Sequence, residues 1–199
     1  MITLDIQQQT PEWIAAKCGI PSASDFDKIV TSTGEPSKQR TKYLYQLAGE
    51  RITGFKEESY QNGAMLRGAE MESEARYLYE MIMEETIDQI GICYPDEQKL
   101  ISCSPDGLIG QDGGLEIKCP SLAIHVGYVI DGRLPSDYFQ QVQGSMYVTG
   151  RAWWAFMSYY PGVKPLIIKI KRDEKFISIL DSEITKFCKE LNEVVEKLK

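Results

Sequence analysis

The chain has 199 residues, enough for one globular domain with a sizeable buried core, and we expect a single domain over residues 1–199. Its net charge of −7 argues against broad non-specific adhesion to nucleic acid, although a DNA enzyme that focuses cations in a groove stays compatible with it. The single histidine, His125, argues against triad hydrolases and histidine-dependent nucleases, since each needs a placed imidazole.

Neither the cysteines nor the N-terminus indicate export. The five cysteines are odd in number and widely spaced, without a C-x-x-C pair, so we expect reduced thiols rather than a disulfide framework or a structural zinc site. No apolar run approaches the roughly 20 residues that cross a bilayer, and the first residues lack the pattern of a secretory signal. We therefore expect a cytoplasmic protein without a membrane partner.

Capping signals and apolar periodicity predict helices that flank a sheet. Thr10-Pro11 is typical of a helix start, the segment from Ser22 to Asp25 resembles a capping box, and Gly54 is typical of a helix end. Alternating apolar residues and the glycine-rich turn at 110–114 predict strands and a hairpin. These elements indicate an α/β fold. The predicted helices cover residues 10–19, 22–30, 43–54, 63–84, 138–148 and 182 onward, and the predicted strands cover 90–94, 100–109, 115–119, 152–160 and 166–171.

The predicted helix over 63–84 carries one carboxylate in an unusual place. Its mostly apolar side contains Glu72 together with Ala75 and Tyr79. Burying a carboxylate is costly unless a partner or a metal ion accepts it. Glu72 is therefore a candidate metal ligand, and the alternative is an ion pair with an Arg or Lys that faces the core.

Two further acids and a lysine fall on the predicted hairpin. Residues two apart on a strand point to the same face, so Glu116 and Lys118 project together while Ile117 faces the core. The hairpin can place Asp106 beside Glu116, where the two carboxylates repel unless a cation lies between them. Mg²⁺ suits such oxygen ligands, and the carbonyl of Ile117 can supply another. The alternatives are an ordinary Asp-Gly turn and a solvated strand face.

Several motifs, found in the same order along the chain, resemble the phage lambda exonuclease family of viral recombinases, or alkaline exonucleases. The motifs are WIAAKCGIPSAS (13–24), RGAEMESEAR (67–76), SCSPDGL (102–108), GLEIKCP (114–120) and YFQQVQGSMYVT (138–149), and the similarity runs from Trp13 to about Lys175. The resemblance implies a restriction-endonuclease-like core, with a central mixed β-sheet flanked by helices. It also implies a phage or prophage protein that acts in the bacterial cytoplasm.

The resemblance also implies roles for particular residues. It implies metal binding by Glu72, Asp106 and Glu116, with Lys118 as the catalytic lysine. It implies a 5′-phosphate pocket, a homotrimeric ring around duplex DNA, and a single-strand annealing protein as a further partner. The pocket residues would be Lys17, Ser24, Ser104 and Gln141.

The chemistry of the pocket residues can be examined independently of the resemblance. A phosphate at the start of the Ser22-capped helix would meet free N–H groups, the Ser24 hydroxyl and the positive end of the helix dipole, although Ser24 can equally be a plain capping residue. The family carries arginine where this chain has Lys17, and lysine lacks the two-pronged grip of a guanidinium. Trp13 and Met65 can press on a terminal base pair or simply pack in the core.

The acids and the lysine predict a metal-dependent nuclease, and the resemblance implies a 5′-to-3′ exonuclease on double-stranded DNA that uses two Mg²⁺ ions, or Mn²⁺. It would release 5′ mononucleotides and leave 3′ single strands for recombination, with Lys118 orienting or deprotonating the attacking water. Two alternatives remain open at this stage. One is a restriction-type or repair-type endonuclease on the same core, and the other is a catalytically silent module that binds DNA ends.

Overall fold

A five-stranded mixed sheet forms the centre of the molecule. The structure is a computed structural model that describes residues 1–56 and 63–199, except for the side chains of residues 63–66 and 69. The strand order is β2-β4-β5-β6-β7, and β5 and β6 run parallel while the other neighbouring pairs run antiparallel. The bounds of these strands are Ile87–Asp88, Gly107–Ile109, Gly113–Lys118, Trp153–Ser158 and Leu166–Lys171.

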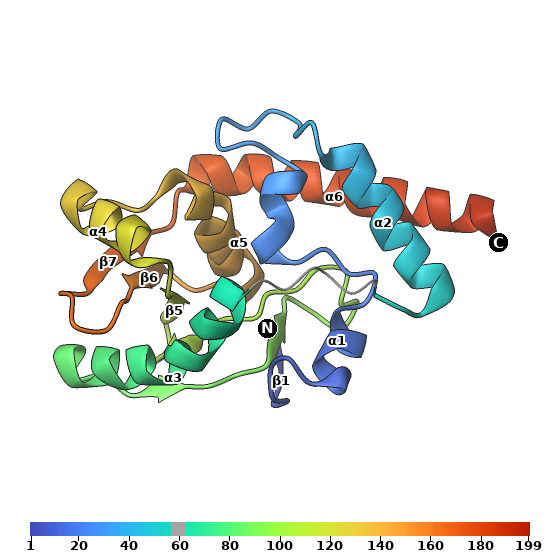
Figure 1. Cartoon of the computed structure of the whole chain (residues 1–199). Helices are drawn as coiled ribbons and strands as arrows, with labels where there is room; N and C mark the ends of the chain where they lie inside the picture. Colours follow the sequence, from blue (N-terminus) through green and yellow to red (C-terminus); the bar gives the residue numbers. More distant parts are fainter. Residues whose placement is uncertain (57–62) are drawn as a thin grey trace.

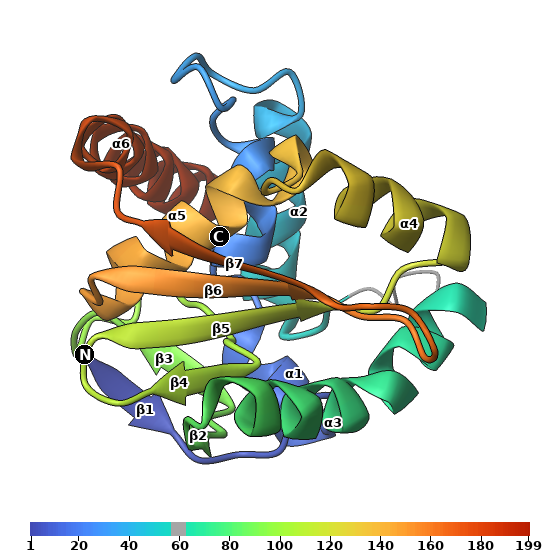
Figure 2. The ribbon, with the colours of Figure 1, turned by 90° about the vertical axis from the view of Figure 1, so that its left-hand side faces the viewer.

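A smaller sheet pairs β1 with β3 antiparallel, and helices cover the central sheet on both faces. Figures 1 and 2 show α3 along one face, with α5 and α6 on the other side. This architecture confirms the predicted α/β fold with a central mixed sheet flanked by helices. The remaining bounds are β1 Ile2–Leu4, β3 Ile92–Tyr94, α1 Pro11–Lys17, η1 Ala23–Lys28, α2 Arg40–Thr53, α3 Gly63–Met83, α4 Leu122–Asp131, η2 Ser136–Tyr138, α5 Phe139–Thr149 and α6 Glu174–Leu198.

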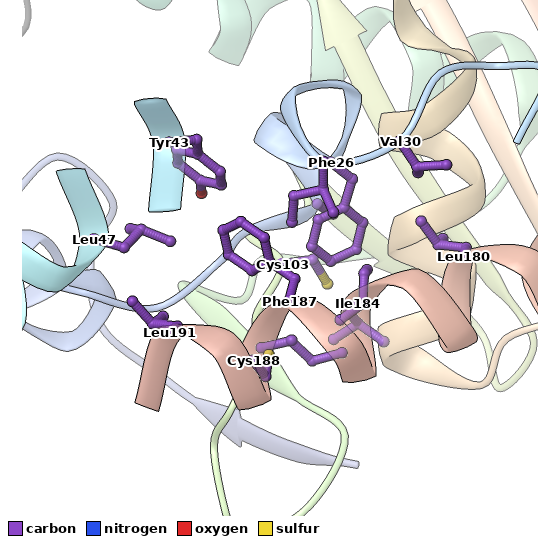
Figure 3. Close-up of a cluster of buried hydrophobic side chains, with 14 of the residues drawn as sticks. Phe26, Val30, Tyr43, Leu47, Cys103, Leu180, Ile184, Phe187, Cys188 and Leu191 are labelled. Atoms are coloured by element: carbon purple, nitrogen blue, oxygen red, sulfur yellow. The ribbon is translucent and has the colours of Figure 1, made fainter. Parts of the chain in front are cut away.

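Two apolar clusters fix which side chains of the central strands face which helices. Leu115 and Ile117 of β5 pack with Ala75 and Tyr79 of α3. The larger cluster lies on the other face, between η1, α2, α5 and α6, and Figure 3 shows the part of it around Phe187. Because side chains alternate along a strand, the even-numbered residues of β5 point toward the α5 side.

Close packing against two tryptophan rings and hydrogen bonds from one arginine hold the base of the β4–β5 hairpin. A side chain on Gly113 or Gly114 would collide with the ring of Trp153 or Trp154, which lie opposite them on β6. Nη1 of Arg151 donates hydrogen bonds to the carbonyls of Ile109, Gly110 and Gly113, at distances of 3.2, 2.8 and 2.6 Å. The register between β5 and β6 therefore admits only glycine at these two positions, because any side chain would meet a tryptophan ring.

Local signals placed several elements correctly. Thr10 caps α1, because its side chain accepts from the N–H of Trp13, and Pro11 opens the helix. Gly54 ends α2 in the left-handed conformation that glycine adopts without strain. The strand predicted over 166–171 coincides with β7. All five cysteines are free, as expected. No helix in the part of the chain that the structure describes is long and apolar enough to span a bilayer.

Other expectations were wrong. The helix predicted over 22–30 is a six-residue 3₁₀ helix, and Ser22 makes no capping hydrogen bond with its side chain. Asp25 does not close a capping box, because its carboxylate pairs with Lys28 at 2.5 Å. The strand predicted over 100–109 is regular in β4 alone, and α6 begins at Glu174 rather than near Ser182 because Asp173 caps it. Strands β1 and β2 and helix α4 were not predicted.

Candidate active site

The pair Glu116 and Lys118 lies at the carboxyl end of β5, on the face opposite Ile117 as the alternation predicted. Lys118 Nζ lies 2.7 Å from Glu116 Oε1. The amide of Gln141, which α5 brings to the same side of the sheet, donates to that oxygen at 2.6 Å. Glu116 is 3% exposed, so its charge is shielded from water and is balanced by these two donors.

Asp106 precedes β4 and lies beside β5. Its backbone N–H donates to Leu115 O at 3.1 Å, and its Oδ2 accepts from the N–H of Ile117 at 2.5 Å. The pKa of Asp106 is raised well above its ordinary value, first by burial and then by the negative charges of Glu116 and Glu72. The structure thus brings Asp106 close enough to the other two acids for their charges to interact.

Glu72 reaches this group from α3 and pairs with Arg76, one turn along the same helix. This ion pair is the alternative that the sequence left open, and it is the state that the structure shows. Burial raises the pKa of Glu72, Arg76 opposes that shift, and the charge of Glu116 adds to it. Arg76 also donates from Nε to Asp106 O at 2.9 Å and from Nη1 to Gln89 Oε1 at 3.1 Å. It therefore holds Glu72 near Asp106.

Protein donors engage all three acids in this arrangement. Within residues 1–56 and 63–199, no group of three or more His, Cys, Asp or Glu side chains has the geometry of a metal site. The donor set nevertheless fits a hard divalent cation in its chemistry, since it offers carboxylate oxygens and Mg²⁺ prefers oxygen ligands. Burial raises the pKa of both Glu72 and Asp106, and the negative charge of Glu116 adds to each shift. A bound cation would oppose these effects.

Lys118 is held as an ammonium group. Burial alone would lower its pKa, but the carboxylates of Glu116 and Asp106 outweigh burial and raise the pKa above its ordinary value. Its Nζ also lies 5.0 Å from the ring centroid of Tyr138, which stacks on Phe156 at 5.2 Å.

Lys17, at the end of α1, is 7% exposed, and its Nζ lies 4.1 Å from the ring centroid of Trp13. Its pKa is lowered to about 8, first by burial and then by the charge of Lys56, while Asp25 and Glu116 act in the opposite direction. The charge of Glu116 thus acts on Lys17, although the two residues come from distant parts of the chain.

Ser24 and Ser104 come from two segments that run side by side. The N–H of Ala23 donates to Ser102 O at 2.9 Å, and the N–H of Ser102 donates to Pro21 O at 2.9 Å. Ser104 Oγ is buried without a hydrogen-bond partner in the described part of the chain, whereas Ser24 is exposed. The expected Ser22-capped helix is wrong, because η1 is a short 3₁₀ helix whose first residues receive no side-chain cap. Phosphate binding at its start stays a prediction.

The two apolar residues proposed to press on a base pair have different outcomes. Trp13 is half-buried, and its indole Nε1 donates to Gly91 O at 3.0 Å. This hydrogen bond and the contact of the ring with Lys17 favour a packing role for Trp13. The side chain of Met65 lies outside the described residues. His125 is buried and structural, since its ring nitrogens lie 2.8 Å from Ser158 Oγ and 3.1 Å from Lys164 O.

Sequence reasoning missed Arg76 and Tyr138 as members of the site. Arg76 follows Glu72 by four residues on a helix, a spacing that alone could have indicated an ion pair. A cavity of about 740 Å³ borders the acids and contains Glu72, Arg76 and Asp106 in its wall. The wall of this cavity also includes the N-terminal segment 5–10, which the sequence did not link to the site.

A mixed sheet with an aspartate just before one strand of a hairpin and a Glu-x-Lys on the next strand is the arrangement of a restriction-endonuclease-like core. The sequence profile of the YqaJ-like viral recombinase domain matches residues 12–152. The chain belongs to this family, which confirms the resemblance found in its motifs.

Solved structures agree with this assignment. An alkaline exonuclease from Laribacter hongkongensis is 32% identical, with a TM-score of 0.86 over 95% of this chain and 96% of that chain. The same enzyme in complex with dAMP gives 32% identity and a TM-score of 0.87 over 96% of each chain. A phage-related exonuclease from Haemophilus somnus, 13% identical over 90% of this chain and 96% of that one, shares the fold with a TM-score of 0.72. A search of curated proteins gives no significant match.

Proposed function

We propose that the chain is a metal-dependent exonuclease that digests double-stranded DNA from the 5′ end. The observation that carries this proposal is the convergence of Glu72, Asp106 and Glu116 from three parts of the chain beside the ammonium of Lys118. Family membership and the 32% identical alkaline exonuclease, whose complex holds dAMP, support a nuclease. Its products would be 5′ mononucleotides and a long 3′ single strand that serves recombination.

The carboxylates of Glu72, Asp106 and Glu116, with the carbonyl of Ile117, are the groups that would hold Mg²⁺, as two ions, or Mn²⁺. Bound there, the metal would lower the pKa of a water molecule and stabilise the leaving 3′ oxygen. Glu72 would exchange Arg76 for the cation. Asp106 keeps one oxygen on the N–H of Ile117, so its carboxylate has a fixed orientation before any cation binds.

Lys118 would act as a hydrogen-bond donor at the reacting phosphate. Because Glu116 and Asp106 raise its pKa, it is protonated at neutral pH and orients the attacking water better than it removes a proton. The hydrogen bond from Gln141 holds Glu116 beside it. This network fixes the distance between the cationic and acidic groups before the substrate arrives, which favours reaction by pre-organisation.

A 5′-phosphate pocket would lie next to the acids. Lys17 supplies a buried cation, Ser104 supplies a hydroxyl whose oxygen has no other partner in the described residues, and Gln141 supplies an amide. Ser24 is exposed and can turn toward a ligand. Charge-assisted hydrogen bonds to a terminal phosphate would place the next phosphodiester bond at Lys118 and give the enzyme its polarity.

The larger assembly is also part of the proposal. We expect a single nuclease domain over residues 1–199 that assembles as a homotrimeric ring around duplex DNA. The 3′ single strand would pass to a single-strand annealing protein, and the protein would act in the bacterial cytoplasm during phage or prophage recombination. These assignments rest on the family to which the chain belongs.

The test is digestion of linear duplex DNA and of covalently closed circular DNA, each with Mg²⁺ and with EDTA. We expect 5′ mononucleotides from the linear duplex with Mg²⁺, and no cleavage with EDTA. Cleavage of the closed circle would favour an endonuclease, because an exonuclease needs an end. Binding of DNA ends without any product at any metal concentration would favour the silent end-binding module.

A further inference from the structure

The N-terminal strap, defined here as residues 5–10, packs against the body of the protein. Before it, β1 pairs with β3, and the N–H of Gly91 donates to Leu4 O at 3.2 Å. A side chain at position 91 would collide with the backbone of Ile6, so the strap lies directly against this glycine. The strap precedes residues 12–152, which match the family profile.

The side chain of Gln8 reaches from the strap to the loop that carries Asp106. Its Nε2 donates to Pro105 O at 2.9 Å and approaches Ile90 O at 3.3 Å. From the other side, Arg76 Nε donates to Asp106 O at 2.9 Å. Two consecutive carbonyls, those of Pro105 and Asp106, are thus held by side chains from two different parts of the chain.

This pair of contacts limits where the carboxylate of Asp106 can lie. β-Bridges hold Ser102 and Cys103 before this loop, and the hydrogen bonds of Asp106 to Leu115 and Ile117 hold its end beside β5. Gln8 and Arg76 add the contacts that fix the carbonyls of Pro105 and Asp106 themselves. Gln8 is half-buried at the wall of the 740 Å³ cavity that also contains Glu72 and Asp106. Losing its two hydrogen bonds would free the peptide next to Asp106 and leave two carbonyls unpaired.

We propose that Gln8 is a positioning residue for Asp106, and that the N-terminal strap is therefore a working part of the active site. This inference rests on the proposed function. Groups that orient metal ligands without touching the metal change metal affinity or activity by about 10- to 100-fold when they are removed. Gln8 tests the idea more cleanly than Arg76, because Arg76 also touches Glu72.

The experiment compares Gln8→Ala and Gln8→Glu with Gln111→Ala, a control at an exposed position on the β4–β5 turn. Glutamate keeps the shape of glutamine but, when ionised, has no N–H to donate to Pro105 O. Four quantities are measured for each protein: kcat and KM on linear duplex with Mg²⁺, the affinity for Mn²⁺ alone by calorimetry without DNA, and the Tm. We expect both Gln8 variants to lose about tenfold in kcat with KM unchanged within about twofold, and to bind Mn²⁺ several-fold more weakly.

Other outcomes overturn the inference. It fails if Gln8→Glu keeps the kcat and the Mn²⁺ affinity of the wild type, or if the Tm alone changes. It also fails if Gln111→Ala loses as much as the Gln8 variants, since the loss would then not depend on the contact between Gln8 and Pro105. A wild-type protein that does not cleave DNA refutes the proposed function instead, and the Mn²⁺ titrations still decide whether Gln8 positions Asp106.

Discussion

Gln141 donates a 2.6 Å hydrogen bond to Glu116 Oε1 and so connects helix α5 to the acidic strand β5. The same oxygen is 2.7 Å from Lys118 Nζ. A single carboxylate oxygen therefore receives both a neutral and a cationic donor, which fixes its direction. The first prediction follows from this arrangement.

Replacing Gln141 with glutamate should impair turnover and shift its pH dependence. The new carboxylate would lie beside Glu116, and two like charges in a buried site raise the pKa of one of them. We expect kcat to fall by about tenfold or more at neutral pH, with the acid limb of the pH–rate profile moved to higher pH. Gln111→Glu, an exposed change on the β4–β5 turn, is the control and should match the wild type.

Asp106→Asn should abolish cleavage while the protein stays folded and binds DNA. Asparagine retains an oxygen that can accept from Ile117 but cannot hold a cation as a carboxylate does. We expect kcat to fall on the order of 1000-fold, measured on linear duplex, with the circular dichroism spectrum unchanged. Asp112→Asn on the same hairpin is exposed and serves as the control. Turnover like that of the wild type would reject Asp106 as a metal ligand.

Preference for 5′-phosphorylated ends should weaken as the pH rises. Burial lowers the pKa of Lys17 to about 8, so the side chain is mostly charged near pH 7 and mostly neutral near pH 9. A neutral amine attracts phosphate less, and the rate ratio between 5′-phosphate and 5′-hydroxyl ends should fall over this range. Lys17→Arg should keep the ratio constant, because a guanidinium stays charged. Equal rates on both kinds of end at pH 7 would remove the pocket from the proposal.

Gly144→Ala should destabilise the contact between η1 and α5. An added Cβ would lie 2.5 Å from Phe26 Cδ2 in the buried core, so one of the two elements must move. We expect the free energy of unfolding to fall by about 1–3 kcal/mol in urea denaturation. Gly127→Ala is the matched control on α4, where an added Cβ meets no atom within 4 Å, and it should raise stability by about 0.5–1 kcal/mol. The opposite ranking would contradict this packing.

The proposed homotrimer can be tested by measuring the mass of the protein in solution. If three copies form a ring, the protein should sediment at about three times its 22.6 kDa mass at working concentration. A monomer under the conditions that support digestion would contradict the ring without affecting the assignment of the acids.

The parts of the fold that the sequence predicted are those governed by local contacts. Caps at Thr10 and Gly54 act within one helical turn, and the two-residue period of β5 follows from the pleat. Helix α4 was missed because it has no clear apolar stripe: its sequence is apolar almost throughout, and several of its apolar residues remain exposed. The segment 22–30 has a capping-box pattern, but Asp25 pairs with Lys28 instead.

The candidate site also contains residues that the sequence predicted and a contact that it did not. Glu116 and Lys118 could be placed on one face from their spacing, and the family motifs indicated Asp106 and Glu72. The contact between Gln8 and Pro105 joins positions 97 residues apart, and no periodicity or motif at either position predicts it. Contacts of this kind depend on how the strap and the loop before β4 meet in the folded chain.

The base of the β4–β5 hairpin has a practical consequence. Trp153 and Trp154 fill the space over Gly113 and Gly114, and Arg151 holds the carbonyls of Ile109 and Gly113 on either side of the turn. We therefore expect these contacts to keep the register when the turn is changed. Residues 110–112 are exposed and lie at the opposite end of β5 from Lys118. A peptide tag or fluorescent reporter inserted there should leave catalysis intact, which makes this tip a handle for immobilising the protein or following it on single DNA molecules.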